Sequence, residues 1–180
     1  TSLLRRYIGK WGYEAHPWSI GRNMDPGSAR NMGGVLEFMD DVVRLVGAKL
    51  HVIRKRSGKR VSLVGWSLGG LYVRQVITLG TPFGDPRSTI VWPIMRRFID
   101  SPEPPEADMA RWMQMAKAPL EVPLSIIWSK TDGFVHPKIA CEREGPRTEN
   151  IHVCSSHAGI GGNPLAFYIV ADRLAPREHD

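Results

Sequence analysis

The chain has 180 residues, a formal net charge of +6, and apolar and charged fractions of 42% and 23%. These values are typical of one ordinary globular domain, spanning residues 1–180 and large enough to bury a core. They exclude a membrane-spanning protein of the helical type over these residues, because no apolar run approaches the ~20 residues that such a helix needs.

The predicted elements begin with a helix end over residues 1–9, a strand over 13–20 and a turn-rich loop over 21–34. A long helix follows and ends at Gly58. Its apolar residues are spaced so that they mark one helix face: Val35, Leu36, Met39, Val42, Val43, Val46, Leu50 and Ile53.

Short apolar strands alternate with helices along the rest of the chain. The strands are predicted over residues 61–64, 75–79, 124–128 and 151–154. A helix begins at Ser67, and a last helix opens at Asn163 and Pro164, with Asn as the cap and Pro at the first helical position. This alternation predicts an α/β fold, with a mostly parallel sheet covered by helices on both faces.

Positive charge gathers between the long helix and the next strand, at Arg54, Lys55, Arg56, Lys59 and Arg60. A nucleic-acid interface would need stacking aromatics or a known motif in this cluster, and it has neither, so we predict no nucleic-acid partner. The cluster is typical of a solvated helix end, where cations complement the helix dipole. Weak attraction to an anionic lipid surface or to an anionic substrate is the alternative.

A serine lies between glycines in Gly65-Trp66-Ser67-Leu68-Gly69, directly after one predicted strand and before a helix. A sharp strand-to-helix turn would raise the Ser67 hydroxyl above the sheet, at a helix N-terminus where negative charge is favoured. The backbone N–H of Leu68 would then point at a developing oxyanion. The pattern makes Ser67 a candidate nucleophile, with a turn serine of purely structural role as the alternative.

A serine nucleophile needs a general base, and the base needs an orienting carboxylate. Asp132 and His157 each follow a later predicted strand by a few residues. Reactive groups gather at the carboxyl ends of parallel strands, so these two residues are the preferred acid and base. Their competitors are Asp85, Asp100 and Asp108 for the acid, and His136 and His152 for the base.

Four segments, LVGWSLGG, VITLGTPF, WSKTDGFV and SSHAGIGGNP, occur in this order. On these segments the chain resembles the α/β-hydrolase family, in particular its bacterial lipases and esterases. The resemblance runs from about Thr1 to Leu174. It implies an α/β-hydrolase fold and hydrolysis of a small-molecule or lipid ester, without a cofactor. It also implies Ser67 as nucleophile, His157 as general base and Asp132 as orienting acid.

The same resemblance places a cap over the active site in the Pro-rich insertion, between about residues 85 and 122. Trp92, Trp112 and Met113 belong to apolar clusters in this insertion, and Trp66 lies next to the serine. These four residues are candidates for substrate binding, while ordinary core packing is the alternative for each. We expect the insertion to be mostly helical and to act as a lid.

Other functions remain open at this stage. The same three residues would serve an acyltransferase or a thioesterase, and a fold of this kind is also compatible with a non-catalytic binding protein. The acyl chain, the alcohol part of the substrate, the oligomeric state and the compartment are not determined by the sequence.

Two cysteines, Cys141 and Cys154, are present. Without a Cys-x-x-Cys pair or a Cys/His quartet, no metal site is expected. A disulfide between them, which would clamp the histidine loop, and two free thiols are both compatible with the sequence.

The crossover after Ser67 is short. Parallel neighbours need a connection of a dozen or more residues, whereas only Leu68 to Arg74 separate Ser67 from the next predicted strand. We therefore expect the printed sequence to lack a segment near residues 72–75. We also expect it to lack a strand before Thr1, whose loop would supply the second oxyanion donor.

Overall fold

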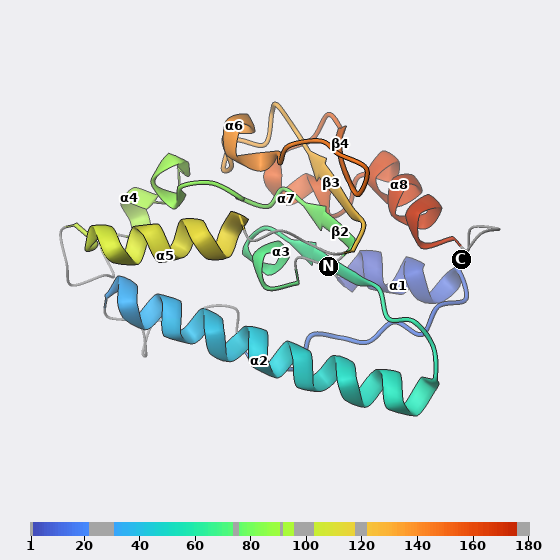
Figure 1. Cartoon of the computed structure of the whole chain (residues 1–180). Coiled ribbons are helices and arrows are strands. Elements are labelled where there is room, and N and C mark those ends of the chain that lie inside the picture. Colours follow the sequence, from blue (N-terminus) through green and yellow to red (C-terminus); the bar gives the residue numbers. More distant parts are fainter. Residues whose placement is uncertain are drawn as a thin grey trace.

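The computed structural model describes residues 2–21, 31–73, 76–90, 92–95, 103–117 and 122–175. Its centre is a sheet of four parallel strands in the order β1-β2-β3-β4 (Figure 1). The strands are β1 (Leu63–Trp66), β2 (Val76–Leu79), β3 (Leu124–Trp128) and β4 (Thr148–His152).

The strand register aligns the ends of all four strands. Leu63 pairs with Val76, Val76 with Leu124, and Leu124 with Thr148, so the strands begin at a common edge. Their carboxyl ends consequently meet at the opposite edge, and the segments that follow β1, β3 and β4 all emerge there. This arrangement can bring together residues as far apart in sequence as Ser67 and His157.

Helices cover both faces of the sheet (Figure 1). Ile126 and Ile127 are adjacent in β3, and successive strand residues point to opposite faces. Ile126 belongs to a core cluster with residues of α2 (Met32–Ser57), α3 (Leu68–Val73) and α5 (Glu106–Lys117). Ile127 belongs to a second cluster with residues of α1 (Ser2–Lys10), α7 (His157–Ile160) and α8 (Pro164–Leu174). The α/β class and the parallel sheet are therefore confirmed, and they are consistent with the α/β-hydrolase fold.

The helices have the following bounds: α1 (Ser2–Lys10), α2 (Met32–Ser57), α3 (Leu68–Val73), α4 (Trp92–Met95), α5 (Glu106–Lys117), α6 (Pro137–Ala140), α7 (His157–Ile160) and α8 (Pro164–Leu174), with a short 3-10 helix at Pro86–Ser88.

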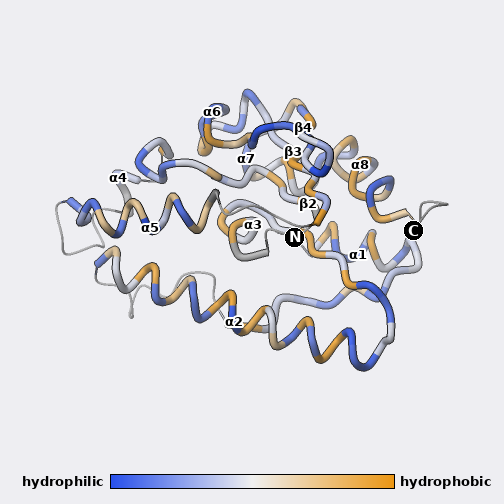
Figure 2. Tube along the Cα trace, in the orientation of Figure 1, coloured by the Kyte–Doolittle hydropathy of each residue, from blue (hydrophilic) through white to orange (hydrophobic). Residues whose placement is uncertain are grey.

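The long predicted helix is α2, and its ends follow from local chemistry. The Asn31 side chain caps it by accepting a hydrogen bond from the Gly34 N–H at 2.9 Å. Gly58 ends it in the left-handed conformation, at φ 65°, as glycine does at helix C-termini. Apolar and polar residues alternate along the helix (Figure 2), and its buried stripe includes Leu36 and Met39.

Three strand predictions need correction. Residues 13–20 form no strand; Pro17 in this segment lacks an N–H, and its carbonyl accepts a hydrogen bond from the Lys49 side chain instead of a strand partner. β1 lies two residues later than predicted, and β4 begins three residues earlier, at Thr148. The first residues of β4 are half-buried and include Glu149 and Asn150, so no apolar run marks where this strand begins.

The described part of the insertion is mostly helical, in the 3-10 helix, α4 and α5. Trp92 and Trp112 are buried in the cluster that includes α2, and Met113 packs against the same cluster. Residues 96–102 and 118–121 lie outside the described residues, as do Arg74 and Gln75, where the expected missing segment falls.

The two cysteines are free thiols, so the alternative of a disulfide is not realised in this structure. The reason lies in β4. Glu142, next to Cys141, is hydrogen-bonded to the Asn150 side chain at 3.1 and 2.8 Å. Cys154 lies four residues further along an extended chain, roughly 13 Å at the strand rise. A disulfide needs Cα atoms within about 7 Å.

Candidate active site

Ser67 lies at the turn between β1 and α3 in a strained backbone conformation. Its φ is 54°, which makes it the one non-glycine residue with a positive φ in the described part of the chain. Such conformations are costly for residues with a side chain and concentrate at functional sites. The Ser67 N–H donates to the Leu79 carbonyl at 2.9 Å. Its own carbonyl accepts from the Thr81 hydroxyl at 3.0 Å. These two hydrogen bonds, to Leu79 at the end of β2 and from Thr81 just after it, hold the strained turn in place.

Gly70 lets this turn approach the end of β2 closely. A Cβ at Gly70 would lie 1.9 Å from the Thr81 Oγ1 atom. Any larger residue would push Thr81 away from the Ser67 carbonyl. Gly70, the second glycine after the serine, thus has a packing reason that the sequence pattern did not assign to it.

The sheet brings the three predicted residues into one hydrogen-bonded chain. The Ser67 Oγ atom lies 2.9 Å from His157 Nε2. His157 Nδ1 lies 2.8 Å from Asp132 Oδ2 and 3.0 Å from Asp132 Oδ1. A carboxylate only accepts hydrogen bonds, so Nδ1 carries the proton and Nε2 is free to accept the serine proton.

Asp132 is oriented by the loop that carries it. Its Oδ1 atom accepts the backbone N–H groups of Phe134 at 2.9 Å and Val135 at 2.7 Å. Its carbonyl accepts the His157 N–H at 2.8 Å, which ties the acid loop to the start of α7. Asp132 and His157 are 3% and 9% exposed, so their interaction is largely removed from water.

Three further residues surround this group, and sequence reasoning missed two of them. Trp66 donates its indole N–H to the His157 carbonyl at 3.1 Å. Phe134 stacks on the His157 ring at a centroid distance of 5.2 Å. Gly80 lies beneath the pair; a Cβ there would come within 3.0 Å of Asp132 Oδ2 and 3.3 Å of His157 Nδ1. The Gly-Thr-Pro turn after β2 was the available signal for Gly80.

The other candidates lie elsewhere or serve other contacts. His136 caps α6 through the Lys138 N–H, and the exposed His152 contacts the Trp128 ring. Asp85 pairs with Arg87, whose hydrogen bonds hold the pKa of that carboxyl below its usual value. Asp108 is half-buried in the first turn of α5, and Asp100 lies outside the described residues.

The candidates for substrate binding differ in exposure. Trp66 is half-buried next to His157. Trp92 and Trp112 are 7% and 3% exposed and offer little surface in this arrangement. Leu68, the candidate oxyanion donor, begins α3 directly after the serine and packs its side chain partly against the core.

Within the described residues, no cluster of three His, Cys, Asp or Glu side chains is suited to hold a metal ion. The helices of that part are also too short or too polar to span a bilayer.

No protein-family model matches this sequence, and no curated protein matches it. Solved structures that are similar in part include the following two. One is the thioesterase domain of NocB in covalent complex with a fluorophosphonate nocardicin G analog, at 15% identity and a TM-score of 0.39 over 74% of this chain and 73% of that one. The other is the N-acyl homoserine lactonase AidH with N-butanoyl homoserine, at 14% identity and a TM-score of 0.45 over 87% and 76%. At these identities and TM-scores neither similarity bears on substrate or reaction.

Proposed function

We propose that this protein is a serine-dependent hydrolase of carboxylic esters, with Ser67, His157 and Asp132 as its catalytic triad. The observation that carries the proposal is the hydrogen-bonded chain from Ser67 Oγ through both nitrogens of His157 to Asp132. It begins on a strained turn at the carboxyl edge of the sheet. Nucleophile, base and orienting acid at these distances are the arrangement that activates a serine.

The chemistry would proceed in two steps. The Ser67 oxygen attacks the ester carbonyl while His157 Nε2 takes the hydroxyl proton, and Asp132 stabilises the imidazolium that forms. Collapse of the tetrahedral intermediate breaks the ester C–O bond, and His157 returns the proton to the departing alcohol. Water, activated by the same nitrogen, then releases the acid from Ser67. The Leu68 N–H would donate to the oxyanion in both steps.

The proposed substrate is a small-molecule or lipid ester. The triad itself selects only an acyl group, so the preference for an apolar acyl chain would come from the side chains around it. Trp66, Phe134 and Ile90 supply apolar surface close to His157 or to the loop that carries Asp132. Phe134 is 48% exposed and Ile90 62%, and the Ile90 N–H donates to the Phe134 carbonyl at 3.2 Å. An apolar rim of this kind suits an acyl chain.

The test combines covalent labelling with turnover. A fluorophosphonate probe should label the wild-type chain once, and Ser67→Ala should abolish both labelling and hydrolysis of p-nitrophenyl esters. The panel should run from short to long acyl chains, so that it also defines the acyl preference. Ser88→Ala, at an exposed serine of the 3-10 helix, is the matched control and should keep both.

Activity retained by Ser67→Ala would exclude this mechanism. Labelling of Ser67 without turnover of any ester, followed by product formation only when an amine or alcohol acceptor is added, would identify an acyltransferase instead. A folded wild-type chain that is neither labelled nor active would indicate a binding protein.

A further inference from the structure

Beyond the ends of β3 and β4, the parallel pairing of the two strands continues through side chains. The last paired residues are Trp128 and His152. The Val153 N–H still donates to the Trp128 carbonyl at 2.9 Å. Two residues later, the Ser155 N–H donates to the side-chain oxygen of Ser129 at 3.1 Å. In a regular parallel ladder this N–H would go to a backbone carbonyl of the neighbouring strand, so the Ser129 hydroxyl stands in for one.

The Ser129 hydroxyl has a full set of hydrogen-bond partners. Its oxygen also accepts the Thr131 N–H at 3.1 Å and lies 3.1 Å from Thr131 Oγ1. Thr131 Oγ1 donates its one proton to the Ser155 carbonyl at 3.1 Å, because a carbonyl can only accept. The Ser129 proton therefore goes to Thr131 Oγ1. Each of the two hydroxyls has a fixed direction of donation, and together they join the chain after β3 to the chain after β4.

These hydrogen bonds lie directly beside Asp132 and His157 in the chain. Asp132 follows Thr131, and His157 comes two residues after Ser155. Ser129 is 1% exposed, so water has little access to its hydrogen bonds. The backbone link from the His157 N–H to the Asp132 carbonyl, at 2.8 Å, comes next along the two segments. The hydroxyl contacts therefore set the separation of the two segments on the strand side of Asp132 and His157.

We propose that Ser129 and Thr131 are positioning residues, whose hydroxyls hold Asp132 and His157 at hydrogen-bonding distance. The inference rests on the proposed function, in which Asp132 is the orienting acid and His157 the general base. Ser129 and Thr131 act through the segments that they join and not on the substrate. When these segments separate, Asp132 no longer fixes the orientation of the imidazole, and small misplacements of a catalytic group are costly. The consequence is a loss in kcat with little change in KM.

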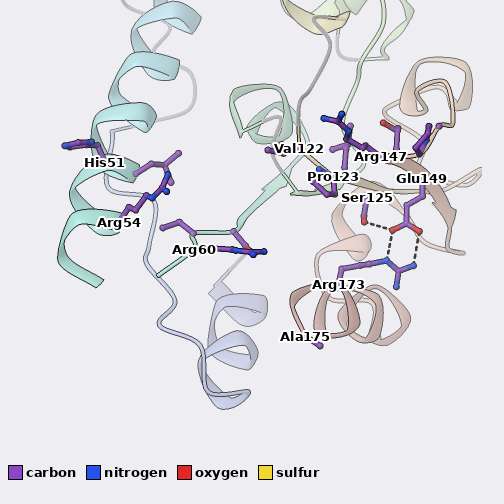
Figure 3. Close-up of a pocket in the computed structure, with 17 residues that line it drawn as sticks. His51, Arg54, Arg60, Val122, Pro123, Ser125, Arg147, Glu149, Arg173 and Ala175 are labelled. Carbon is purple, nitrogen blue, oxygen red and sulfur yellow. Dashed lines mark hydrogen bonds and ion pairs between the residues drawn. The ribbon is translucent and has the colours of Figure 1, made fainter. Parts of the chain in front are cut away.

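A buried serine near the start of β3 offers a matched control. Ser125 is 6% exposed and, like Ser129, joins the β3 chain to the β4 chain through its hydroxyl, which donates to Glu149 at 2.5 Å. Glu149 also accepts from Arg173, and Figure 3 shows these three side chains together. Ser125→Ala therefore removes the same kind of contact between the same two strands, at the edge of the sheet opposite Ser67.

The experiment compares Ser129→Ala, Thr131→Val, Thr131→Ser and Ser125→Ala with the wild type. Thr131→Val removes the hydroxyl of an exposed residue with little change of shape, so it carries the test even where Ser129→Ala folds poorly. Thr131→Ser keeps the hydroxyl. The first readout is kcat and KM for p-nitrophenyl esters, beside the melting temperature. The second does not depend on turnover: proton NMR of the hydrogen-bonded Nδ1–H of His157, assigned by its absence from His157→Gln.

We expect kcat to fall about tenfold in Ser129→Ala and in Thr131→Val, with KM changed by less than about twofold. The Nδ1–H resonance should broaden or move upfield in both variants. Thr131→Ser should restore kcat and the resonance. Ser125→Ala should lower the melting temperature and leave kcat and the resonance as they are in the wild type.

Unchanged kcat in both hydroxyl-free variants would overturn the proposal, as would a loss of kcat with an unchanged resonance. An equal loss of kcat in Ser125→Ala, or a wild type without the resonance, would also overturn it. Failure of the proposed function has a different signature. A wild-type chain that hydrolyses no ester can still show the resonance and its change in Ser129→Ala, which would leave the positioning role standing without the ester chemistry.

Discussion

Phe134 lies flat against the imidazole of His157, with ring centroids 5.2 Å apart and ring planes at 27°. The same residue donates its backbone N–H to Asp132 at 2.9 Å, so one loop position both orients Asp132 and covers the His157 ring. Its side chain is 48% exposed, which leaves the outer part of the ring available to a substrate. The backbone role survives any substitution except proline, which lacks the N–H, whereas the ring contact is lost when the ring is removed.

The first prediction follows from this separation. Phe134→Ala should lower kcat/KM for p-nitrophenyl esters by roughly tenfold, since an aromatic ring pair is worth about 0.5–1.5 kcal/mol. Phe134→Leu should restore KM more than kcat, because it returns apolar surface without the stacked ring. Tyr168→Ala, at an exposed aromatic of α8, should leave both parameters unchanged. Equal kinetics for Phe134→Ala and wild type would remove Phe134 from the site.

The second prediction concerns Gly80, at φ +55° next to Asp132 and His157. Gly80→Ala should displace Asp132 and His157 by a few tenths of an ångström and reduce kcat by about tenfold to 10²-fold, because misplacement of this kind is costly in catalysis. Gly12→Ala is the matched control. Gly12 also has positive φ, +91°, but nothing lies within 4 Å of its added Cβ. It should lower the melting temperature without lowering kcat, and a similar kcat loss in both variants would point to backbone strain alone.

The third prediction concerns the thiols. Cys154 is exposed, while burial raises the pKa of the half-buried Cys141 thiol. Only the thiolate is alkylated, so a raised pKa leaves a smaller fraction of Cys141 in the reactive thiolate form at a given pH. Iodoacetamide labelling followed by peptide mass spectrometry should modify Cys154 first near pH 7.5, and Cys141 should catch up as the pH rises. Failure of both to react without a reductant would instead indicate the disulfide that the structure does not contain.

Prediction from the sequence was most successful where one residue type had one physical reason. The Asn163 cap, the Gly58 stop and the apolar run of β3 were predicted at their observed positions. The rule that carboxyl ends of parallel strands share an edge predicted that Ser67, Asp132 and His157 lie close together, and the structure brings them within hydrogen-bonding distance.

The failures have a common cause, because they depend on contacts between distant segments. The segment before Gly21 looks like a strand but lies beside α2, with Lys49 bonded to Pro17 and Ser19. β4 is held by its pairing with β3 and not by its own apolarity. The role of Gly80 depends on how close Asp132 and His157 come. None of these contacts is periodic in the sequence, and the Gly-Thr-Pro turn marks the position of Gly80 without revealing its neighbours.

The last prediction separates a lid from a core element in α5. Trp112 is 3% exposed, donates its indole N–H to the Gly84 carbonyl at 3.2 Å, and belongs to the cluster that contains Leu36 and Met39 of α2. Arg111 forms an ion pair with Asp40 across the same two helices. Trp112→Ala should therefore lower the free energy of unfolding by about 3–5 kcal/mol, as large-to-small changes do in a packed core. Arg111→Gln, which breaks only a half-exposed ion pair, should cost less than about 1 kcal/mol.

Urea denaturation measures both values, and hydrogen exchange supplies the independent readout. If α5 is anchored through Trp112, its amides should exchange as slowly as those of the adjoining turns of α2, because opening α5 would expose the same cluster to water. A lid requires the opposite pattern: fast exchange in α5, slow exchange in α2, and a Trp112→Ala variant with normal stability but altered KM for long-chain esters. The burial of Trp112 in the cluster shared with α2 favours the anchored helix.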